Sequence, residues 1–410
     1  MNKEIKERIE CIKNNQLPKG YRRIKDIGIA PEDWTLGKMS DVIENVSRPV
    51  PKPNEPYWRL GIKSWAKGTF HAFVDDPETV NMDELYEVKE NDLIVNITFA
   101  WEHAIAIAKK EDEGLLVSHR FPTYVFKEGQ VPEYYQAVIT QRYFKDMLDH
   151  ISPGGAGRNR VLNRKAFSNL PCVIPSKTEQ EKIAQIFTSF DEIIERYENQ
   201  KEELMNLKRF YLKNMFPDKK SNTPKTRFSR FDAPWSRFKI QEIANRYDNL
   251  RVPIAANLRV QGSTPYYGAN GIQDYVEGFT HEGEFVLVAE DGANDLKDYP
   301  INCVRGRIWV NNHAHVLQAK LDLADNYFLS YAIKNANIES LLVGGGRAKL
   351  NAETLMNIEV ALPSLEEQQV IGEYIKCLDD CITLYQKMID SQKDYKKAIS
   401  RLLLTGVVRV

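Results

Sequence analysis

Two glycine-rich segments, each followed by an arginine, carry the clearest chemical signal in the sequence. Gly154-Gly155-Ala156-Gly157-Arg158 and Gly344-Gly345-Gly346-Arg347 occupy equivalent places in the two halves of the chain. Glycine permits close approach of the backbone, and an arginine guanidinium offers a forked set of donors, a combination that suits a phosphate backbone. The alternative is a flexible hinge with a solvated arginine, and the sequence leaves both interpretations open.

Basic residues near these segments and in the first half extend the same chemistry. Arg160 and Lys349 follow the glycine-rich segments and would add positive charge toward the same anion. Lys63, Trp65 and Lys67 interleave cations with an aromatic ring, which is a nucleic-acid pattern but also that of an exposed strand face.

Two segments of the second half combine aromatic, amide and imidazole groups. In Tyr266-Tyr267-Gly268-Ala269-Asn270-Gly271, the rings could stack on bases and the amide could bridge an adenine edge, although a β-turn with packed tyrosines is equally consistent. Asn311-Asn312-His313-Ala314-His315 places two imidazoles on one strand face, but no cysteine or carboxylate cluster nearby completes a ligand set, so no metal is expected. The predicted DNA-binding residues are Lys63, Trp65, Lys67, Arg158, Arg160, Tyr266, Tyr267, Asn270, Asn312, His313, Arg347 and Lys349.

The sequence contains no recognisable catalytic motif. It has no Gly-x-x-x-x-Gly-Lys-Ser/Thr phosphate loop, no Gly-x-Ser-x-Gly elbow and no His-Glu-x-x-His metal helix. The Asn-Pro-Pro-Tyr type of loop, which holds a flipped base for methylation, is also missing. We therefore expect that the chain is not an enzyme.

The glycine-rich segments precede a long internal repeat. Residues 162–216 return as residues 350–404, with Pro175 and Pro363 at matched positions 188 residues apart. Both copies begin with a leucine-asparagine pair, pass through a proline and enter Ser-x-x-Glu-Gln. A repeat at this spacing implies two whole modules.

Each copy of the repeat predicts one long helix. Ser176 with Glu179, and Ser364 with Glu367, form capping boxes, in which the hydroxyl accepts from a backbone N–H and the glutamate reaches back to the N-cap. Apolar residues then recur at three- and four-residue spacing. At about 1.5 Å per residue, roughly 40 residues give a helix of about 60 Å, long enough to act as a spacer.

Two matched amphipathic helices are expected to pair with each other. Each seam carries one glutamine, Gln200 or Gln392, and an antiparallel pairing that places these two opposite each other would fix the register, with Tyr197 facing Tyr395 and Leu204 facing Met388. The predicted helix-pairing residues are Ile183, Phe190, Tyr197, Gln200, Leu204, Leu378, Tyr385, Met388, Gln392 and Tyr395.

The predicted fold class is α+β, with two mixed α/β target-binding domains, each followed by a long helix, and the two helices pairing as an antiparallel coiled coil. Short β-rich runs such as 92–99, 104–108, 123–126, 285–289, 307–310 and 314–318 build the domains, with a helix over 132–149. The predicted boundaries are an amphipathic arm at 1–30, the first domain at 31–175, helix 176–216, a linker at 217–233, the second domain at 234–362 and helix 363–410.

Composition bounds the class of protein. The 410 residues are 42% hydrophobic, which suffices for two or three buried cores, and the formal net charge of −1 is unlike that of a nonspecific nucleic-acid coat. No run of about 18 apolar residues occurs, so no membrane partner is expected and the cytoplasm is the expected location. The five scattered cysteines form no disulfide framework and are expected to be reduced.

Together, these features resemble the specificity subunit of Type I restriction-modification systems over nearly the whole length. The resemblance rests on two Leu/Ile-Pro-Ser-x-x-Glu-Gln helix starts, at 174–180 and 362–368, each following a β-rich domain and a glycine-rich loop with an arginine. Segments 262–271 and 311–316 are also similar to family segments. The first domain departs from the commoner pattern at 96–101, where many relatives have a glycine-rich turn, so no individual base contact is carried over.

The resemblance implies two target-recognition domains, each reading one half of a split double-stranded DNA site, held apart by antiparallel helices that act as a ruler. It implies two modification subunits docked on the helices, which bind S-adenosylmethionine and methylate adenine N6, and motor-nuclease restriction subunits that cut unmodified DNA. This chain is expected to bind no cofactor itself. Half-sites on one face of a duplex recur about every 34–36 Å, within the span of such helices.

Two other functions remain as alternatives. A coiled-coil adaptor or structural protein would use the same helices to dimerise and the globular parts to bind proteins, without salt-sensitive DNA binding. A self-contained methyltransferase or nuclease is disfavoured because the loops that such enzymes require are missing.

Overall fold

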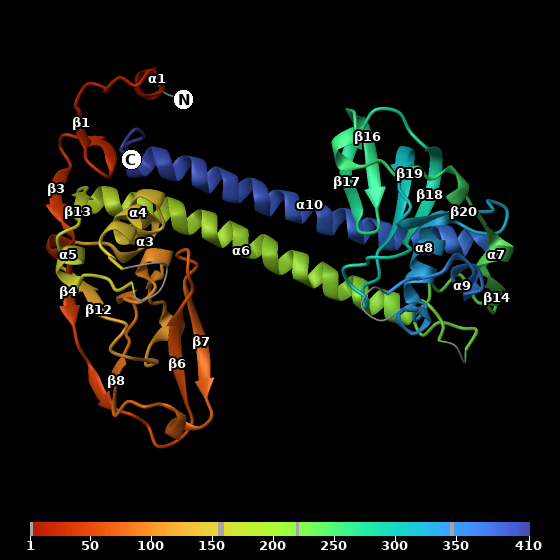
Figure 1. Cartoon of the computed structure of the whole chain (residues 1–410), viewed down its shortest axis with the longest axis horizontal. Coiled ribbons are helices and arrows are strands. Elements are labelled where there is room, and N and C mark those ends of the chain that lie inside the picture. Colours follow the sequence, from red (N-terminus) through yellow and green to blue (C-terminus); the bar gives the residue numbers. More distant parts are fainter. Residues whose placement is uncertain (1–2, 155–159, 219–220, 345–347) are drawn as a thin grey trace. The chain divides into compact units, whose positions relative to one another are not determined.

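The structure is a computed structural model that describes residues 3–154, 160–218, 221–344 and 348–410. It divides into two compact units, which we call unit 1 (Met1–Arg196 with Ile389–Val410) and unit 2 (Tyr197–Met388). Each unit contains one mixed domain and a part of both long helices, α6 (Lys177–Asn214) and α10 (Leu365–Leu404) (Figure 1). The predicted scheme instead lists the two helices as separate segments.

Unit 1 contains two sheets and several short helices. The strands are β1 (Tyr21–Ile24), β2 (Gly28–Pro31), β3 (Thr35–Lys38), β4 (Ile43–Val46), β5 (Pro49–Pro51), β6 (Tyr57–Ile62), β7 (Thr69–Val74), β8 (Glu84–Glu87), β9 (Leu93–Val95), β10 (Ile105–Ile107), β11 (Leu116–Val117), β12 (Thr123–Phe126) and β13 (Pro171–Ile174). The helices are α1 (Lys3–Lys13), α2 (Met39–Val42), α3 (Pro132–Ile139), α4 (Arg142–His150), α5 (Arg164–Ser168) and the 3-10 turns η1 (Pro77–Thr79), η2 (Ala100–Glu102) and η3 (Lys110–Asp112).

The sheets of unit 1 pack face to face. One sheet has the order β10-β9-β12-β4 and is antiparallel, and the other has the order β5-β8-β11-β6-β7. Strand β9 is buried on both sides, because Leu93 packs in the core with α3 and α4 while Ile94 packs in the core beneath the second sheet. Two further antiparallel pairs, β1 with β2 and β3 with β13, complete the unit.

Unit 2 is built around one six-stranded sheet of order β15-β20-β18-β19-β16-β17. Its strands are β15 (Ala244–Arg246), β16 (Gln261–Gly268), β17 (Gly271–Val276), β18 (His281–Ala289), β19 (Ile301–Val310), β20 (Ala314–Ala319) and the separate pair β14 (Ser236–Lys239) and β21 (Glu359–Leu362). The helices are α7 (Ile240–Ile243), α8 (Asn326–Asn335), α9 (Ala352–Met356) and the turns η4 (Asp248–Leu250), η5 (Ala256–Leu258) and η6 (Glu339–Leu341).

The core of unit 2 lies between the sheet and α8. Val286 and Val288 belong to the same buried cluster as Phe328 of α8. Ile371 of α10 and Phe216, just beyond α6, complete this cluster. The intervening side chains of β18, such as Leu287, pack in a second core on the other face. This alternation is what a strand period of two residues requires.

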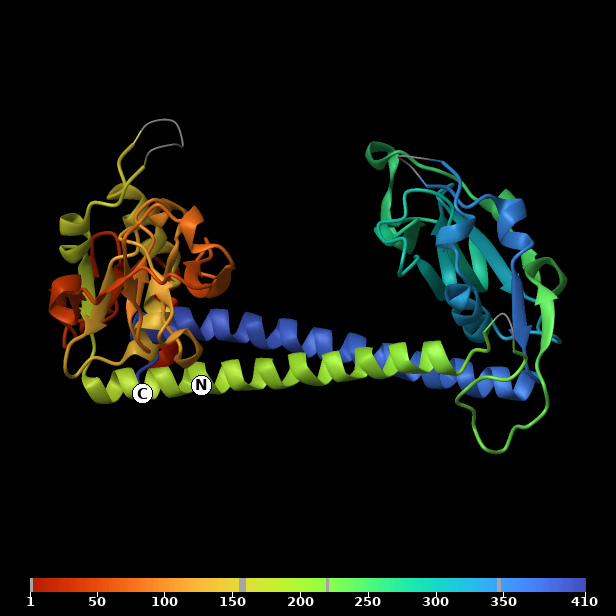
Figure 2. The ribbon, with the colours of Figure 1, turned by 90° about the horizontal axis from the view of Figure 1, so that it is seen from below.

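Helices α6 and α10 run antiparallel in both units (Figures 1 and 2). In unit 2, Lys201 donates to Gln386 at 2.6 Å and Lys208 pairs with Asp379, so that residue numbers rise along one helix as they fall along the other. The predicted pairing is therefore present.

The predicted register of the pair is wrong. It would place Asp191 opposite Arg401, but in unit 1 Asp191 pairs with Lys396, five residues earlier, at 2.5 Å. Tyr197 contacts Tyr385 with ring centroids 5.9 Å apart instead of Tyr395, whose side chain is 61% exposed.

The physical reason for this register lies at the helix ends. Ile183 of α6 and Leu403 of α10 are buried in the same core of unit 1, and Phe216 and Ile371 share the core of unit 2. Burial of these side chains stabilises the pair far more than a match between Gln200 and Gln392 would.

Several other elements differ from prediction. The single helix expected over 132–149 is two helices, because the helix ends at Thr140 and a new one starts after Gln141. The expected arm at 1–30 includes the hairpin β1–β2, which packs with Trp34 and Val173. All five cysteines are free. None of the helices that the structure describes combines the length and apolar character needed to cross a membrane.

Candidate nucleic-acid interface

Three segments that are distant in the sequence meet in unit 1, and we call this meeting place loop junction 1. They are the β6–β7 turn (63–68), the segment 96–103 and residues 160–162 after the glycine-rich loop. The Trp65 N–H donates to the Glu102 carbonyl at 2.9 Å, and the Leu162 N–H donates to the Ile97 carbonyl at 2.8 Å. Segment 96–103 therefore contacts both Leu162 and the turn that carries Lys63, Trp65 and Lys67.

Three of the predicted residues of loop junction 1 face solvent. Trp65 is 62% exposed and lies under the Lys145 ammonium, 4.9 Å from the ring centroid. Lys63 and Lys67 are exposed, and neither forms an ion pair within the described part of the chain. Such cations beside an exposed ring can contact a phosphate backbone and a base.

Arg160 is half-buried, and its guanidinium is held by neighbouring residues. Its guanidinium donates to the Ser152 carbonyl at 2.9 Å, pairs with Asp149 at 2.6 Å and lies over the ring of Trp101 at 5.1 Å. It therefore anchors the end of the glycine-rich loop, and its contact with DNA stays a prediction.

Unit 2 repeats this arrangement, and we call it loop junction 2. It comprises the β16–β17 turn (268–271), the segment 290–294 and residues 348–350 after the second glycine-rich loop. The Asn270 side chain donates to the Gly292 carbonyl at 3.0 Å and accepts from the Asn294 N–H at 2.9 Å. The Leu350 N–H donates to the Glu290 carbonyl at 2.7 Å, as Leu162 does to Ile97 in unit 1.

Carboxylates neutralise the basic groups of loop junction 2. Glu290 accepts from Arg251 at 2.7 Å and from Lys349 at 2.9 Å, and Asp291 lies 2.6 Å from His313 Nδ1. Burial alone would raise the pKa of Glu290, but the hydrogen bonds from Arg251 and Lys349 outweigh it and hold that pKa below its ordinary value. Lys349, which follows the second glycine-rich segment, is therefore held in place by its charge pair with Glu290.

His315 extends this network into the interior. It is 1% exposed, and its Nδ1 lies 2.7 Å from Asp248 Oδ2 while its Nε2 lies 2.9 Å from the Leu350 carbonyl oxygen. The imidazole therefore links Asp248 to the residue that ends loop junction 2. The Asp248 pKa is raised by burial but lowered more strongly by hydrogen bonds from His315 and the Val316 N–H, and lies below its ordinary value.

Two predictions for the tyrosine-containing turn need correction. Tyr266 is 1% exposed, and its hydroxyl accepts from the Ile254 N–H at 3.0 Å, so the prediction that this ring stacks on DNA is wrong. Its side chain points inward because successive residues of β16 alternate between faces. The Asn270 amide is occupied by Gly292 and Asn294 of segment 290–294 and is not free to bridge an adenine edge.

The remaining candidates divide between partly buried, exposed and undescribed positions. Tyr267 packs partly against the second core of unit 2, and Asn312 is exposed. Arg158 and Arg347 lie outside the described residues. Their contact with DNA remains a prediction.

Sequence reasoning missed several residues of the two junctions. The predicted site residues do not include Phe99 and Trp101 of unit 1 or Arg251, Glu290 and Asp291 of unit 2. These side chains nevertheless line the junctions or hold them in place. The signal available was weak, because Arg251 is 39 residues from Glu290 in the chain. The only signal for segment 96–103 was that residues 96–101 stand where many relatives have a glycine-rich turn.

The Ser-x-x-Glu-Gln motif anchors each long helix to its own domain. The Glu179 N–H donates to Ser176 Oγ at 3.3 Å, as the capping box predicts, but the Glu179 carboxylate binds Trp34 Nε1 at 2.8 Å and Arg409 at 2.6 Å instead of reaching back to the N-cap. Glu367 likewise accepts two bonds of 2.7 Å from Arg227. The glutamates are tertiary anchors more than caps.

The glutamine of each motif holds the start of another helix. Gln180 accepts from the N–H of Val131, the N-cap of α3, at 3.0 Å, and Gln368 accepts from the N–H of Asp325, the N-cap of α8, at 3.1 Å. Both amides donate to the carbonyl of the proline five residues earlier, at 3.0 Å. The same motif therefore fixes the same geometry twice.

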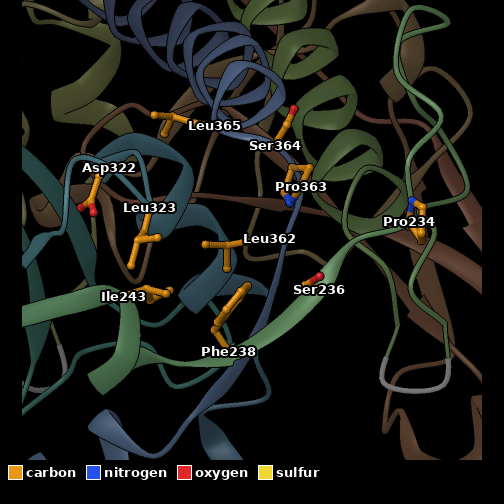
Figure 3. A pocket seen from close by; sticks show the side chains of 10 residues that line it. All are labelled: Pro234, Ser236, Phe238, Ile243, Asp322, Leu323, Leu362, Pro363, Ser364 and Leu365. Atoms are coloured by element: carbon orange, nitrogen blue, oxygen red, sulfur yellow. The ribbon is translucent and has the colours of Figure 1, made fainter.

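A hollow of about 270 Å³ lies where α10 begins (Figure 3). Phe238, Ile243 and Leu323 line it together with Pro363 and Ser364 of the motif. Its lining comes from other elements than the segments of loop junction 2.

Known proteins are similar to this chain along most of its length. The family described as Type I restriction modification DNA specificity domain matches residues 31–206 and 233–391. The chain is 48% identical over 140 residues to the putative type I restriction enzyme specificity subunit S.HindORF215P of Haemophilus influenzae, a match spanning 34% of this chain and 35% of that one. It is 22% identical over 416 residues to the putative type I restriction enzyme MjaX specificity subunit of Methanocaldococcus jannaschii, spanning 94% and 96%.

Solved structures share the fold. The crystal structure of the Type-I restriction-modification S subunit from M. genitalium superposes with a TM-score of 0.63 at 15% identity, covering 92% of this chain and 96% of that one. A chain from a structure concerned with complex assembly and conformational transition of the type I R-M system gives 0.52 at 14% identity, covering 92% and 99%. With two matched domains, each followed by a long helix, the chain belongs to the family of Type I restriction-modification specificity subunits.

Proposed function

We propose that this chain is the noncatalytic DNA-recognition subunit of a Type I restriction-modification complex and that its two domains read the two halves of a split site. The observation that carries the proposal is the repetition of one loop junction in both units. In each unit a leucine after the glycine-rich segment, Leu162 or Leu350, donates its N–H to a second segment, and that segment also hydrogen-bonds a hairpin turn. Two similar surfaces on one chain suit a DNA site with two parts.

The paired helices are proposed to set the spacing between the half-sites. Helix α6 has 38 residues and α10 has 40, so each spans about 57–60 Å at 1.5 Å per residue. The ion pairs and the ring contact between α6 and α10 support a stiff spacer, because they hold the two helices to each other.

The partners that supply chemistry are proposed to dock on these helices. Large apolar side chains on α6 and α10 remain exposed, which is typical of a surface that another protein covers. The most exposed are Met205, Phe210, Leu384 and Tyr395. We assign to the partners two methyltransferase subunits, which bind S-adenosylmethionine and modify adenine N6, and motor-nuclease subunits; this chain binds no cofactor in the proposal.

A domain exchange tests this function. The chain and its methyltransferase subunits should protect a bipartite sequence in a footprinting assay. Replacement of residues 31–170 with those of a relative should change one half-site and leave the other and the gap unchanged. A complex that prefers no split sequence, or that copurifies with proteins other than a methyltransferase and shows no salt-sensitive DNA binding, would contradict the proposal in favour of an adaptor.

A further inference from the structure

Unit 1 contains a pocket of about 330 Å³ that adjoins loop junction 1. One wall is the outer face of the β6–β7 hairpin, with Arg59, Gly61, Phe70 and Ala72 from paired positions of the two strands. The size lies at the lower end of the range for small-molecule sites, about 300–1,000 Å³.

The other wall is made by the junction itself. Ser64 belongs to the β6–β7 turn, and Asn96, Phe99 and Glu102 belong to the segment 96–103. The Ser64 hydroxyl donates to the Glu102 carboxylate at 2.7 Å, which ties the two segments together at the pocket. The pocket and loop junction 1 therefore share residues.

Aromatic rings dominate the apolar part of the lining. Phe70, Phe99 and Phe121 all contribute, and Phe70 and Phe99 remain 44% and 47% exposed. The ring of Phe70 covers the backbone of Gly61, where an added Cβ would lie 2.2 Å from the ring. Exposed rings on two sides of a pocket favour a flat, unsaturated ligand.

The polar groups of the pocket provide both donors and acceptors. Arg59 is half-buried and forms no ion pair within the described residues, so its charge is available to an acceptor. The Asn96 side-chain oxygen is occupied by the N–H and hydroxyl of Thr98, while the Glu102 carboxylate already accepts from Ser64 and can accept again. A phosphate would use Arg59 but not the rings, and an aliphatic chain would use neither the charge nor the carboxylate.

We propose that this pocket receives one nucleobase that is unstacked from the half-site read by unit 1. A base has the flat faces that the phenylalanine rings can cover and, on its edge, the acceptors and donors that Arg59 and Glu102 match. Lys63 and Lys67, exposed on the same turn as the lining residue Ser64, would hold the flanking phosphates. The inference rests on the proposed function and adds a specificity-determining site to it.

Base-pair mismatches test the proposal, because an enzyme or binder that unstacks a base binds more tightly where that base is already unpaired. The full complex with its methyltransferase subunits is titrated with duplexes in which each pair of the half-site is mispaired in turn. A duplex mispaired at one position other than the methylated adenine should bind about ten-fold more tightly, because unpairing of that base no longer opposes binding.

Pocket variants then assign the effect to this site. In Phe99→Ala and in Arg59→Gln the tightening at that position should disappear, while tightening at the methylated adenine, which the methyltransferase unstacks, should persist. Phe73→Ala is the matched control, because Phe73 is a 51% exposed phenylalanine of the same hairpin that does not line the pocket. A urea-unfolding transition equal to that of the wild type reports that the variants fold.

Two results would overturn the pocket assignment while the proposed function stands. One is that only the methylated adenine responds to mispairing; the other is that the second response persists in both pocket variants. A complex without preference for any split sequence would instead overturn the proposed function itself.

Discussion

Arg409, beyond the end of α10, forms a bidentate ion pair with Glu179 at the start of α6: Nε lies 2.6 Å from Oε1 and Nη2 lies 3.0 Å from Oε2. The Glu179 side chain is 6% exposed, and it also accepts from Trp34. In unit 2 the equivalent glutamate, Glu367, pairs with Arg227, which lies beyond the end of α6. In each unit, the motif glutamate near the start of one long helix is therefore paired with an arginine that lies beyond the end of the other long helix.

Glu179→Gln and Glu367→Gln should both destabilise their units by about 1.5–3 kcal/mol, because each removes charge-assisted hydrogen bonds from a buried position. The loss should be larger for Glu367→Gln, since Arg409 retains Asp33 as a second carboxylate partner. Urea unfolding measures both. Glu181→Gln, at an exposed position of α6, is the control and should change stability by less than about 0.5 kcal/mol. Equal effects of all three variants would show that the motif glutamates do not anchor the helices.

Gly406→Ala should destabilise unit 1 by about 1 kcal/mol or more. Gly406 has φ = 64°, in the left-handed region, and an added Cβ would lie 2.4 Å from Pro31 Cγ. The residue follows α10 and accepts a hydrogen bond at its carbonyl from Tyr21. Thermal unfolding measures the effect, and Gly68→Ala is a useful contrast, because that glycine also has a positive φ but nothing within 4 Å of an added Cβ. A smaller loss in Gly406→Ala than in Gly68→Ala would contradict the packing argument.

Unit 2 should lose stability on acidification because of Asp248 and Glu290. The folded pKa of each carboxyl lies below its ordinary value, 3.8 for Asp248 and 4.5 for Glu290, so the folded unit binds fewer protons than the unfolded chain. Their stabilisation is complete above those ordinary values and is lost as the pH falls through the lower folded values. Unfolding free energies measured between pH 6 and pH 3 should fall more steeply in the wild type than in Glu290→Gln. Parallel curves would show that Glu290 is not linked to folding.

DNA binding should depend on salt partly through Lys63 and Lys67. Both are exposed cations of loop junction 1, and each phosphate contact contributes about one to the slope of log K against log salt. In the complex with the methyltransferase subunits, the double variant Lys63→Ala/Lys67→Ala should lower that slope by about two without changing the preferred sequence. Lys110→Ala, an exposed lysine of η3, should leave the slope unchanged. A change in sequence preference with an unchanged slope would place the two lysines at bases instead of phosphates.

The long helices and the duplication could be predicted because their signals are local. Ser176 and Glu179 lie within one helical turn, and the apolar period is visible along the following residues. The partners of Glu179 could not be predicted in the same way, since Trp34 is 145 residues away and Arg409 is 230 residues away. A capping box and a tertiary anchor have the same local sequence.

For the helix register and for the candidate site, too, local sequence predicts one part and tertiary packing decides the rest. The register depends on which apolar residues, such as Ile183 and Leu403, enter a domain core, and a pattern of glutamines on the helices does not contain that information. At the site, the sequence selected the β6–β7 turn and the two glycine-rich segments as DNA-binding candidates, and their contact with DNA stays a prediction. The sequence prediction failed for Tyr266, because the phase of a strand relative to its core is set by tertiary packing.

The most direct test of the account lengthens both helices together. Seven residues inserted between Gln200 and Lys201 and seven between Gln386 and Lys387, positions that face each other across the pair, add two turns or about 10.5 Å. At 3.4 Å per base pair, methylome sequencing of cells that carry the variant should show both half-sites unchanged and the gap between them longer by about three base pairs. An unchanged gap, or altered half-sites with the original gap, would contradict the claim that paired helices set the distance between two reading domains.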